Sequence, residues 1–286
     1  MRILSFGSLN IDYVYEMDHF VQPGETLGSS SLNLFPGGKG LNQSVAAAKA
    51  GGQVLHGGAI GKDGLWLKDT LTSHGVNAEE VLILEDSQTG HAIIQTIPDG
   101  ENAILLFAGT NKSIPVSYME QMLSRMEPGD WVLLQNEIND VPLLMKMAKN
   151  AGLKVAFTPA PMEPAVRQWP LELADLIFVN ETESAALEDI LENLETEIVL
   201  TQGSKGAAVK TGSNLTFCPA CKANVVDTTA AGDTFAGFYL VSRMEGQSIE
   251  ESLQKACAAA ALSTETKGAC SSIPSLEQTL KRMRQS

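Results

Sequence analysis

One segment near the C-terminal end of the chain carries residues suited to phosphoryl transfer. Residues 227–235 read DTTAAGDTF, so a run of small residues follows a strand-like stretch and opens a helical pattern. Free backbone N–H groups at such a helix start bind a developing anion, because they point at it and the helix dipole favours negative charge. Asp233 lies among them and could act as a general base toward a hydroxyl group. Taken alone, the segment is more simply explained by an ordinary capped helix with an acid in its first turn.

Two segments in the N-terminal part could hold a hydroxyl-rich ligand. Asn10 and Asp12 follow the first strand-like run and point to the same side of an extended chain. Ligands of open α/β sheets bind beyond the carboxyl ends of the strands, which makes both residues candidate acceptors for substrate hydroxyls. Residues 36–42 read PGGKGLN, and the glycines around Lys39 let the backbone approach a ligand closely. This is neither a Walker A loop nor a dinucleotide fingerprint, so the turn alone does not define a function.

Two later segments offer groups for a metal ion and a nucleotide. Residues 180–183 read NETE, which places an amide and a carboxylate on one helical turn. Such oxygen ligands suit Mg²⁺ bound through water, but a capping box has the same spacing and is favoured for this tetrad alone. Residues 201–206 read TQGSKG and predict either a tight hairpin or a contact with nucleotide phosphates.

The elements that must position these residues follow an α/β rhythm. Short apolar runs alternate with helical patterns, which predicts a parallel sheet with helices on both faces in one domain over residues 1–286. The expected strands are 3–7, 53–60, 131–134, 154–157, 176–179 and 197–200. The expected helices are 41–50, 64–74, 142–151 and 181–191. Beyond residue 197 we expect several short strands ending near Val226, and then helices over 232–243, 249–262 and from Ser275.

Two segments break this rhythm. Residues 12–35 and 90–107 are strand-like and lack an amphipathic helix, and a Pro98-Asp99-Gly100 turn joins two apolar runs in the second. We expect them to form a small β appendage over one edge of the domain, which would serve as a lid or an interface. Its strands would expose apolar edges if left alone, so we expect a homodimer that pairs them, with a self-covering monomer as the alternative.

Composition excludes several classes of protein. The 286 residues are 44% hydrophobic, which excludes intrinsic disorder. The net charge of −14 argues against nucleic-acid and anionic-membrane partners, so a substrate with phosphates must be held by local devices. No stretch has the roughly 18 apolar residues of a membrane span. No signal-peptide pattern is complete before Asp12, which predicts a cytoplasmic protein.

The cysteines raise one further possibility. Cys218 and Cys221 have C-x-x-C spacing, and the other two cysteines are Cys257 and Cys270. A structural zinc site would need a second ligand pair, which the scattered histidines do not supply. We therefore expect plain thiols, with Cys270 as a spectator.

Taken together and in this order, the segments resemble the pfkB family of carbohydrate kinases, the ribokinase-type sugar kinases. The resemblance covers essentially the whole chain, and its most specific parts are the GGKGLN block at 37–42, the NETE tetrad and the DTTAAGDTF block. It implies a three-layer α/β/α, Rossmann-like domain with a small β-sheet lid. It also implies ATP-dependent phosphorylation of a sugar hydroxyl.

The resemblance assigns roles residue by residue. Asp233 would be the catalytic base, and the anion hole would be the backbone of Ala230, Ala231, Gly232 and Asp233. The sugar would contact Asn10, Asp12, Gly38, Lys39, Asn42, Glu137 and Asp233. Asn180 and Glu183 would order Mg²⁺ through water. The nucleotide site would be lined by Asn180, Thr201, Gly203, Gly206 and Gly232. An activating monovalent cation, usually K⁺, would lie at Asp227, Thr229, Ser263, Thr266, Gly268 and Ser272, mostly on backbone carbonyls.

The sequence also departs from the family pattern. Ala230 stands where many members have glycine, and Ala236 where many have asparagine. Asn10, Asp12 and the full GGKGLN block favour ribose, phosphorylated on its 5-hydroxyl to ribose 5-phosphate. The lid segments shape sugar choice, so fructose, 2-keto-3-deoxygluconate and nucleosides such as pseudouridine remain alternatives. From another class, a non-catalytic sugar or nucleotide sensor is the alternative, and the intact Asp233 argues against it.

Overall fold

An eight-stranded mixed sheet forms the centre of the structure, a computed structural model that describes residues 1–284. Its strand order is β14-β13-β12-β11-β10-β9-β1-β4. The bounds are β1 (Ile3–Phe6), β4 (Val54–Gly57), β9 (Trp131–Gln135), β10 (Lys154–Thr158), β11 (Leu176–Asn180), β12 (Glu197–Thr201), β13 (Gly206–Thr211) and β14 (Asn214–Pro219). The strands from β4 to β12 pair in parallel, whereas β13 and β14 pair antiparallel.

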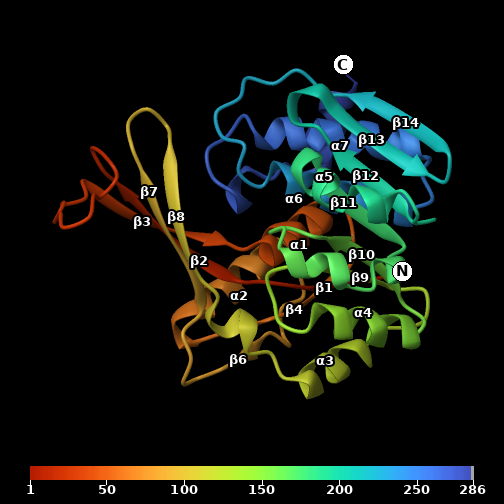
Figure 1. The fold of residues 1–286 in the computed structure, drawn as a ribbon, viewed down its shortest axis with the longest axis horizontal. Coiled ribbons are helices and arrows are strands. Elements are labelled where there is room, and N and C mark those ends of the chain that lie inside the picture. Colours follow the sequence, from red (N-terminus) through yellow and green to blue (C-terminus); the bar gives the residue numbers. More distant parts are fainter. Residues whose placement is uncertain (285–286) are drawn as a thin grey trace.

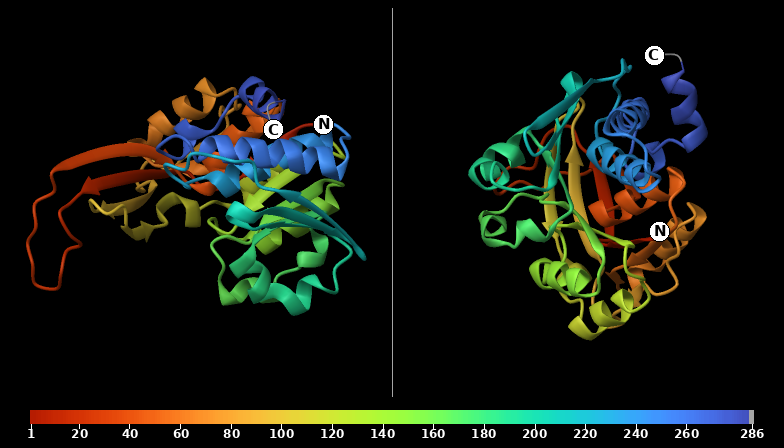
Figure 2. Two further views of the ribbon diagram at one scale, coloured as in Figure 1. Left: turned by 90° about the horizontal axis from the view of Figure 1, so that it is seen from above. Right: turned by 90° about the vertical axis from the view of Figure 1, so that its right-hand side faces the viewer.

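Helices cover both faces of this sheet (Figures 1 and 2). One face carries α1 (Lys39–Lys49), α2 (Leu65–Ser73), α6 (Ala231–Met244), α7 (Ile249–Ser263) and α8 (Leu276–Met283). The other carries α3 (Val116–Leu123), α4 (Val141–Asn150) and α5 (Glu181–Leu191). Shorter 3₁₀ helices are η1 (Lys62–Gly64), η2 (Gly109–Lys112), η3 (Pro164–Gln168), η4 (Leu171–Leu173), η5 (Gly203–Lys205) and η6 (Cys270–Ser272).

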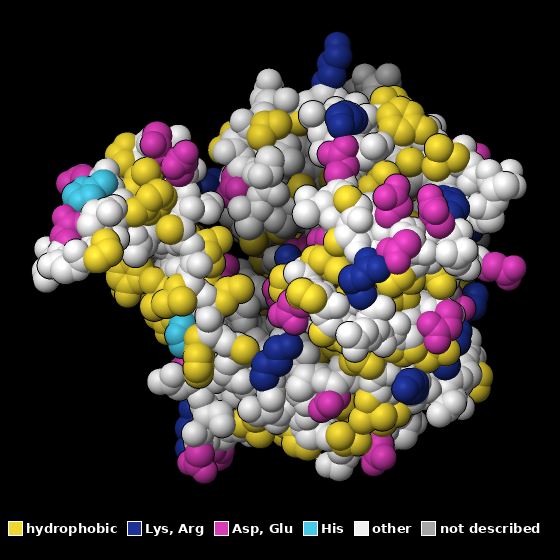
Figure 3. Space-filling model, viewed as in Figure 1, with side chains coloured by type: hydrophobic (Ala, Val, Ile, Leu, Met, Phe, Trp, Pro, Cys, Tyr) yellow, Lys and Arg dark blue, Asp and Glu magenta, His cyan; other side chains and the backbone are white. Residues whose placement is uncertain are grey.

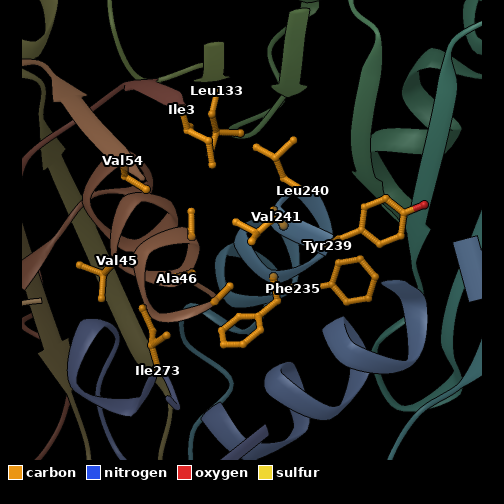
Figure 4. Packing of buried hydrophobic residues seen from close by; sticks show 14 of the residues in the cluster. Ile3, Val45, Ala46, Val54, Leu133, Phe235, Tyr239, Leu240, Val241 and Ile273 are labelled. Carbon is orange, nitrogen blue, oxygen red and sulfur yellow. The ribbon is translucent and has the colours of Figure 1, made fainter. Parts of the chain in front are cut away.

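The core has two layers because the sheet is buried on both faces. Neighbouring residues of β1 alternate between the layers: Ile3 belongs to the layer under α1 and α6, and Leu4 to the layer under α3 and α4. Figure 4 shows the first layer, where side chains from the sheet, α1 and α6 meet and Phe235 stacks on Tyr239 with ring centroids 5.9 Å apart. This packing fixes the position of α6, whose first turn contains Asp233.

A second sheet projects from one side of the main body (Figure 1), and we call it the lid sheet. It contains β2 (Asn10–Glu16), β3 (Ser31–Gly37), β7 (Gly90–Thr96) and β8 (Asn102–Phe107) in the order β3-β2-β7-β8. The two segments expected to form a β appendage therefore pair with each other, through parallel β2 and β7. Figure 3 shows hydrophobic side chains along this sheet. Its exposed apolar residues are Leu32, Leu34, Phe35, Ile104, Leu105, Leu106 and Phe107.

Two expectations for the elements were wrong in detail, and one helix was missed. The single strand expected over 53–60 is two strands, because the chain leaves the main sheet at Gly58 and β5 (Ala59–Ile60) pairs with β6 (Leu82–Ile83). The last strand ends at Pro219 instead of near Val226, because the amides of Val226 and Asp227 donate to the Thr264 carbonyl beyond α7. Helix α3 was not expected.

The expected α/β architecture is otherwise present, with strand and helix bounds shifted by a few residues. Among the described residues, no helix has both the length and the apolar character needed to cross a membrane. Residues 285–286, the end of the expected domain, lie outside the described residues.

Candidate active site

A cleft opens at the carboxyl ends of the central strands, between β10, β11, β12 and the start of α6. Its lining combines four of the segments singled out in the sequence. The lining residues are Lys39, Thr158, Ala160, Phe178, Val179, Asn180, Glu183, Thr201, Thr228, Ala230, Ala231, Gly232 and Asp233. Segments nearly 200 residues apart in the chain, such as Lys39 and Asp233, therefore meet at the edge of the sheet where open α/β folds bind ligands.

The start of α6 has the geometry of an anion site instead of an ordinary cap. Ala230 stands at the N-cap position in the left-handed region, with φ 60°, and no side chain caps the helix. The Ala231 amide donates to the Thr228 carbonyl over 3.2 Å. The amides of Gly232 and Asp233 follow in the first turn, where N–H groups have no intrahelical acceptor. Both residues line the cleft, so these donors can serve a bound anion.

The Asp233 carboxylate is buried and held by two amide side chains. Asn42 Nδ2 donates to its Oδ2 over 3.2 Å, and Gln43 Nε2 donates to its Oδ1 over 2.9 Å. Burial raises the pKa of Asp233, and Lys39 and the two amides oppose that rise. A carboxyl with a raised pKa that stays close to a lysine suits the role of a general base near neutral pH.

Gln43 is a functional residue that the sequence reasoning missed. It is fully buried on α1, and its Oε1 accepts a hydrogen bond from Gln135 Nε2 over 2.7 Å. Its position next to Asn42, as a polar side chain on a helix otherwise rich in small and apolar residues, was the available signal. The side-chain oxygen of Asn42, Oδ1, is buried and has no hydrogen-bond partner within the described part of the chain.

Glu137 fastens the glycine-rich turn to the end of β1. Its Oε2 accepts hydrogen bonds from the Lys39 amide over 2.9 Å and from the Ser8 hydroxyl. The Gly40 amide donates to the Ser8 Oγ over 3.2 Å. Gly40 has to be glycine, because a Cβ there would meet the Ser8 nitrogen at 2.3 Å. Ser8 was not singled out in the sequence.

Asn10 and Asp12 lie at the root of the lid sheet, next to this turn. Asn111 Nδ2 donates to Asn10 Oδ1 over 2.7 Å, so Asn111 positions Asn10. Asp12 packs against Gly37, where a Cβ would meet Oδ2 at 2.2 Å. Burial, and then the charge of Glu137, raise the pKa of Asp12 to about 7. These two residues do not line the cleft. They lie beside the glycine-rich turn that carries Lys39, and Lys39 does line it.

Lys39 is the cation that connects the two parts of the site. Its pKa is raised first by Asp233, with burial acting in the opposite direction and Glu137 and Glu183 adding to the rise. One lysine therefore lies within electrostatic range of the three carboxylates. Such a group can neutralise a negatively charged ligand placed between them.

The NETE tetrad forms the capping box that its spacing also allowed. Glu183 N donates to Asn180 Oδ1 over 2.8 Å, and Asn180 N donates to Glu183 Oε2 over 2.9 Å. Asn180 Nδ2 also donates to Glu183 Oε1 over 3.0 Å. Burial raises the pKa of Glu183. Both residues line the cleft, so the cap holds a carboxylate in place at its wall.

The expected nucleotide residues separate into two groups. Thr201 lines the cleft together with Asn180 and Gly232. Gly203 lies in the turn between β12 and β13, and Gly206 begins β13; both are outside the cleft lining. Both have positive φ, and a Cβ at Gly206 would meet the Cys218 carbonyl at 2.1 Å. The hairpin that the TQGSKG pattern allowed is present.

Asp227 joins the two halves of the expected cation site. Its Oδ1 accepts from the Thr229 amide over 2.9 Å and from the Thr229 hydroxyl over 2.6 Å, and its Oδ2 accepts from the Gly268 amide over 2.9 Å. Burial raises the pKa of Asp227, but the hydrogen bonds from Thr229 and Gly268 outweigh it, and the net shift is downward. The carboxylate thus connects the two loops.

The other expected cation residues have local contacts. The hydroxyls of Ser263 and Ser272 donate to carbonyls three residues earlier, at Ala260 and Ala269. The Thr266 amide donates to the Ser263 carbonyl over 3.5 Å. Within residues 1–284, no three or more His, Cys, Asp or Glu side chains are grouped to hold a metal ion.

A family model for pfkB family carbohydrate kinases matches residues 1–276. The chain belongs to this family. The kinase is 33% identical to a ribokinase of Haemophilus influenzae over 96% of each chain. Among solved structures, it is similar to ribokinase of Cryptococcus neoformans in complex with ADP, with a TM-score of 0.88 and 34% identity over 98% of this chain and 99% of that one.

A second solved structure resembles the kinase equally well. Arabidopsis thaliana ribokinase complexed with ribose and ATP has a TM-score of 0.88 and 29% identity, covering 100% of this chain and 99% of that one. The family and the ribokinase-like α/β fold expected from the sequence are confirmed by these matches.

Proposed function

We propose that this kinase transfers the γ-phosphoryl group of ATP to the 5-hydroxyl of D-ribose and forms ribose 5-phosphate. The observation that carries the proposal is the buried Asp233 carboxylate at the uncapped start of α6, held by Asn42 and Gln43 beside Lys39. Base, anion site and cation are thereby collected in one cleft. The similarity to ribokinases over nearly the full chain supports ribose as the acceptor.

In the proposed reaction, the ribose hydroxyl gives its proton to Asp233 while its oxygen attacks the γ-phosphorus. The bond from that phosphorus to the bridging oxygen breaks, and ADP leaves. The amides of Gly232 and Asp233 donate to the oxygens on which charge develops, and Lys39 adds a positive charge beside them. Positioning and electrostatics of this kind supply most of the catalysis in phosphoryl transfer.

The residues proposed for the sugar surround the root of the lid sheet. The buried, unpartnered Oδ1 of Asn42 is a ready acceptor for a sugar hydroxyl. Asp12 and Glu137 are further acceptors, and the backbone of Gly38 and Lys39 lies between them. Asn10, positioned by Asn111, completes the set. A site rich in amide and carboxylate oxygens suits a ligand with many hydroxyl donors.

We propose that Asn180 and Glu183 hold Mg²⁺ through water. Both residues carry oxygen atoms of the kind that Mg²⁺ prefers, and each carboxylate oxygen of Glu183 accepts one hydrogen bond and retains acceptor capacity. Bound there with ATP, Mg²⁺ would neutralise charge on the phosphates. Thr201 and Gly232 would line the same nucleotide site; Gly203 and Gly206 would act through the turn that follows Thr201.

We also propose that a monovalent cation, K⁺, binds among the carbonyls of the loops joined by Asp227. The proposed site comprises Asp227, Thr229, Ser263, Thr266, Gly268 and Ser272. The bond from the Gly268 amide to Asp227 supports this, because it fixes one loop against the other. The cation would then stabilise the segment that leads into the anion site at Ala230.

The apolar lid sheet supports a homodimer in which two lid sheets cover each other. Its exposed leucines, Ile104 and two phenylalanines lie on the two edge strands, β3 and β8, and Figure 3 shows hydrophobic side chains along this projecting sheet. Sedimentation equilibrium of the wild type against a Leu105→Lys variant tests this, since a charge should convert dimer to monomer.

We propose a cytoplasmic location, where ATP is available.

The proposed function is tested by following ATP consumption with Mg²⁺ and K⁺ present. The acceptors are ribose, deoxyribose, fructose, 2-keto-3-deoxygluconate and nucleosides, with Asp233→Asn as the inactive control. Turnover selective for ribose is the expected result. Selective turnover of another acceptor would keep the kinase and replace the substrate, whereas no turnover of any acceptor would favour a non-catalytic sensor.

A further inference from the structure

Three thiols converge at the β14 edge of the main sheet, outside the cleft lining. Cys218 lies on β14, Cys257 on α7, and Cys221 just beyond the end of β14. The thiols of Cys218 and Cys257 are close enough to interact directly, and Cys221 interacts electrostatically with both. The Cys218 thiol itself donates to the Pro219 carbonyl over 3.5 Å. Neither the fold nor the proposed phosphoryl transfer explains why three of the four cysteines meet here.

The cluster is partly open to solvent. Cys257 is 6% exposed and belongs to the core layer, whereas Cys218 and Cys221 are half-buried and pack against that layer. Burial raises the pKa of the Cys218 and Cys257 thiols. Both thiols are therefore largely protonated at neutral pH. Because the thiolate is the reactive form, they would react slowly with oxidants and stay reduced when little oxidant is present.

A metal does not account for this arrangement. In the part of the chain that the structure describes, no three His, Cys, Asp or Glu side chains have positions suited to a metal ion. Zinc would also need a fourth ligand. In intracellular proteins, thiols that do form a disulfide usually do so transiently, in catalysis or redox sensing.

Cys218 and Cys257 lie at the start of two paths along the chain that lead to the proposed nucleotide side of the active site. Residues 219–230 run from Cys218 to the anion site at Ala230. The helix that carries Cys257 ends at Ser263, directly before Thr264, and Gly268 follows four residues later. The two paths meet where Thr264 accepts from Val226 and Asp227, and where Gly268 donates to Asp227.

We propose that Cys218 and Cys257 are an oxidisable pair, which hydrogen peroxide converts to a disulfide that links β14 to α7 and weakens the use of ATP. One thiol attacks the peroxide, becoming a sulfenic acid and releasing water. The second thiol then attacks the sulfenic sulfur, forms the S–S bond and releases a second water. The thiols lose two electrons and two protons, and one peroxide becomes two waters. A dithiol reductant reverses the step by exchange.

The effect on ATP follows from the connections of the two paths. The disulfide would fix the distance between β14 and α7 and restrict the segment that ends in the anion site. Apart from Asp233 in α6, the proposed sugar contacts lie on β2, on α1 and its preceding turn, and in the loop after β9, away from both paths, and should not change. We therefore expect KM for ATP to rise at least about threefold on oxidation, with KM for ribose unchanged.

The test uses the full-length protein treated with hydrogen peroxide and then with alkylating agent. Peptide mapping by mass spectrometry should find a Cys218–Cys257 bridge that dithiothreitol removes, with the increase in KM for ATP appearing and disappearing with it. Cys218→Ser should abolish both effects. Cys257→Ala is the second variant, because serine could destabilise the core at that position. Cys270→Ala is the matched control, a buried thiol outside the cluster, and should oxidise like the wild type.

Peptide mapping and the kinetic measurements test two separate parts of the proposal. A bridge from Cys218 to Cys221, or no bridge at all, would overturn the inferred pair irrespective of enzyme activity. A Cys218–Cys257 bridge that leaves KM for ATP unchanged would overturn the link to the active site. Only this kinetic part rests on the proposed function, and a reduced protein that is inactive toward every acceptor would show failure of that function instead.

Discussion

Gln43 donates a hydrogen bond from Nε2 to the Asp233 Oδ1 over 2.9 Å. Its own Oε1 accepts from Gln135 Nε2 over 2.7 Å, so the amide can present only its nitrogen to the carboxylate. Both glutamines are fully buried, on α1 and β9. The proposed base is therefore held in orientation by side chains from two other elements, and not by α6 alone.

Asp233→Asn should remove the proposed base and leave the fold intact. The amide cannot accept the hydroxyl proton, so we expect kcat to fall by at least about 10²-fold. A coupled ADP-release assay measures the rate, and circular dichroism checks folding. Asp189→Asn, at an exposed ion pair with Arg167, is the matched control and should stay active. Near-wild-type turnover of Asp233→Asn would refute the assignment.

Gln43→Leu should change the pH dependence of the reaction. The hydrogen bond from Gln43 lowers the pKa of Asp233, so its removal raises that pKa further. Because the base must be ionised, the acidic limb of kcat/KM should move to higher pH. Activity should recover partly at high pH. A uniform loss at every pH would indicate a merely structural role, and exposed Gln53→Leu serves as the control.

Asp12 should make stability depend on pH. Its folded pKa of about 7 exceeds the unfolded value of about 3.9, so the folded state holds an extra proton between them. The resulting contribution to stability is complete below about pH 4 and is lost as pH rises through about 7.

Asp12→Asn removes this titration, so the variant should gain stability relative to the wild type by about 2–3 kcal/mol on going from about pH 5 to about pH 8. Urea unfolding at the two pH values measures the difference. Exposed Asp18→Asn should show no such gain. An equal ΔΔG at both pH values for Asp12→Asn would contradict a raised pKa.

Ala230→Gly should stabilise the protein slightly. A left-handed backbone costs a non-glycine residue about 1–2 kcal/mol, and the greater freedom of unfolded glycine offsets about 0.4–1 kcal/mol of that. We expect a net gain of about 0.5 kcal/mol in unfolding free energy, measured in urea. Ala231→Gly, one residue later in the helix, should instead lose about 0.5–1 kcal/mol. If both substitutions lowered the free energy of unfolding, strain at Ala230 would be excluded.

Replacement of K⁺ by a large organic cation should lower turnover. The proposed site depends on carbonyls of two loops that Asp227 holds together, and a large cation cannot fit among them. Asp227→Asn should weaken the response to K⁺, because an amide is a poorer acceptor for the Thr229 and Gly268 amides. Rates measured at constant ionic strength should separate this from a salt effect. Equal rates in both cations would remove the cation proposal.

Much of the site could be predicted from local patterns. Glycines around Lys39, small residues before Asp233 and the N-x-x-E spacing each reflect backbone geometry that a short segment must satisfy on its own. The structure places Lys39, Asn180, Glu183, Thr201 and Asp233 in one cleft. Gly203 and Gly206 show the limit of this reasoning, because a glycine required for a turn and a glycine that contacts phosphate have the same sequence signal.

The sequence by itself determined the alternation of strands and helices, the family and the identity of the proposed base, because periodicity, turn chemistry and contiguous motifs are encoded over short stretches. Only the tertiary structure revealed the partners of that base and the meeting of Cys218 with Cys257. Gln43, Gln135 and Asn111 act through side chains about 90 to 190 residues away in the chain. Such contacts depend on the order of strands in the sheet and on helix packing, so a local sequence pattern cannot predict them.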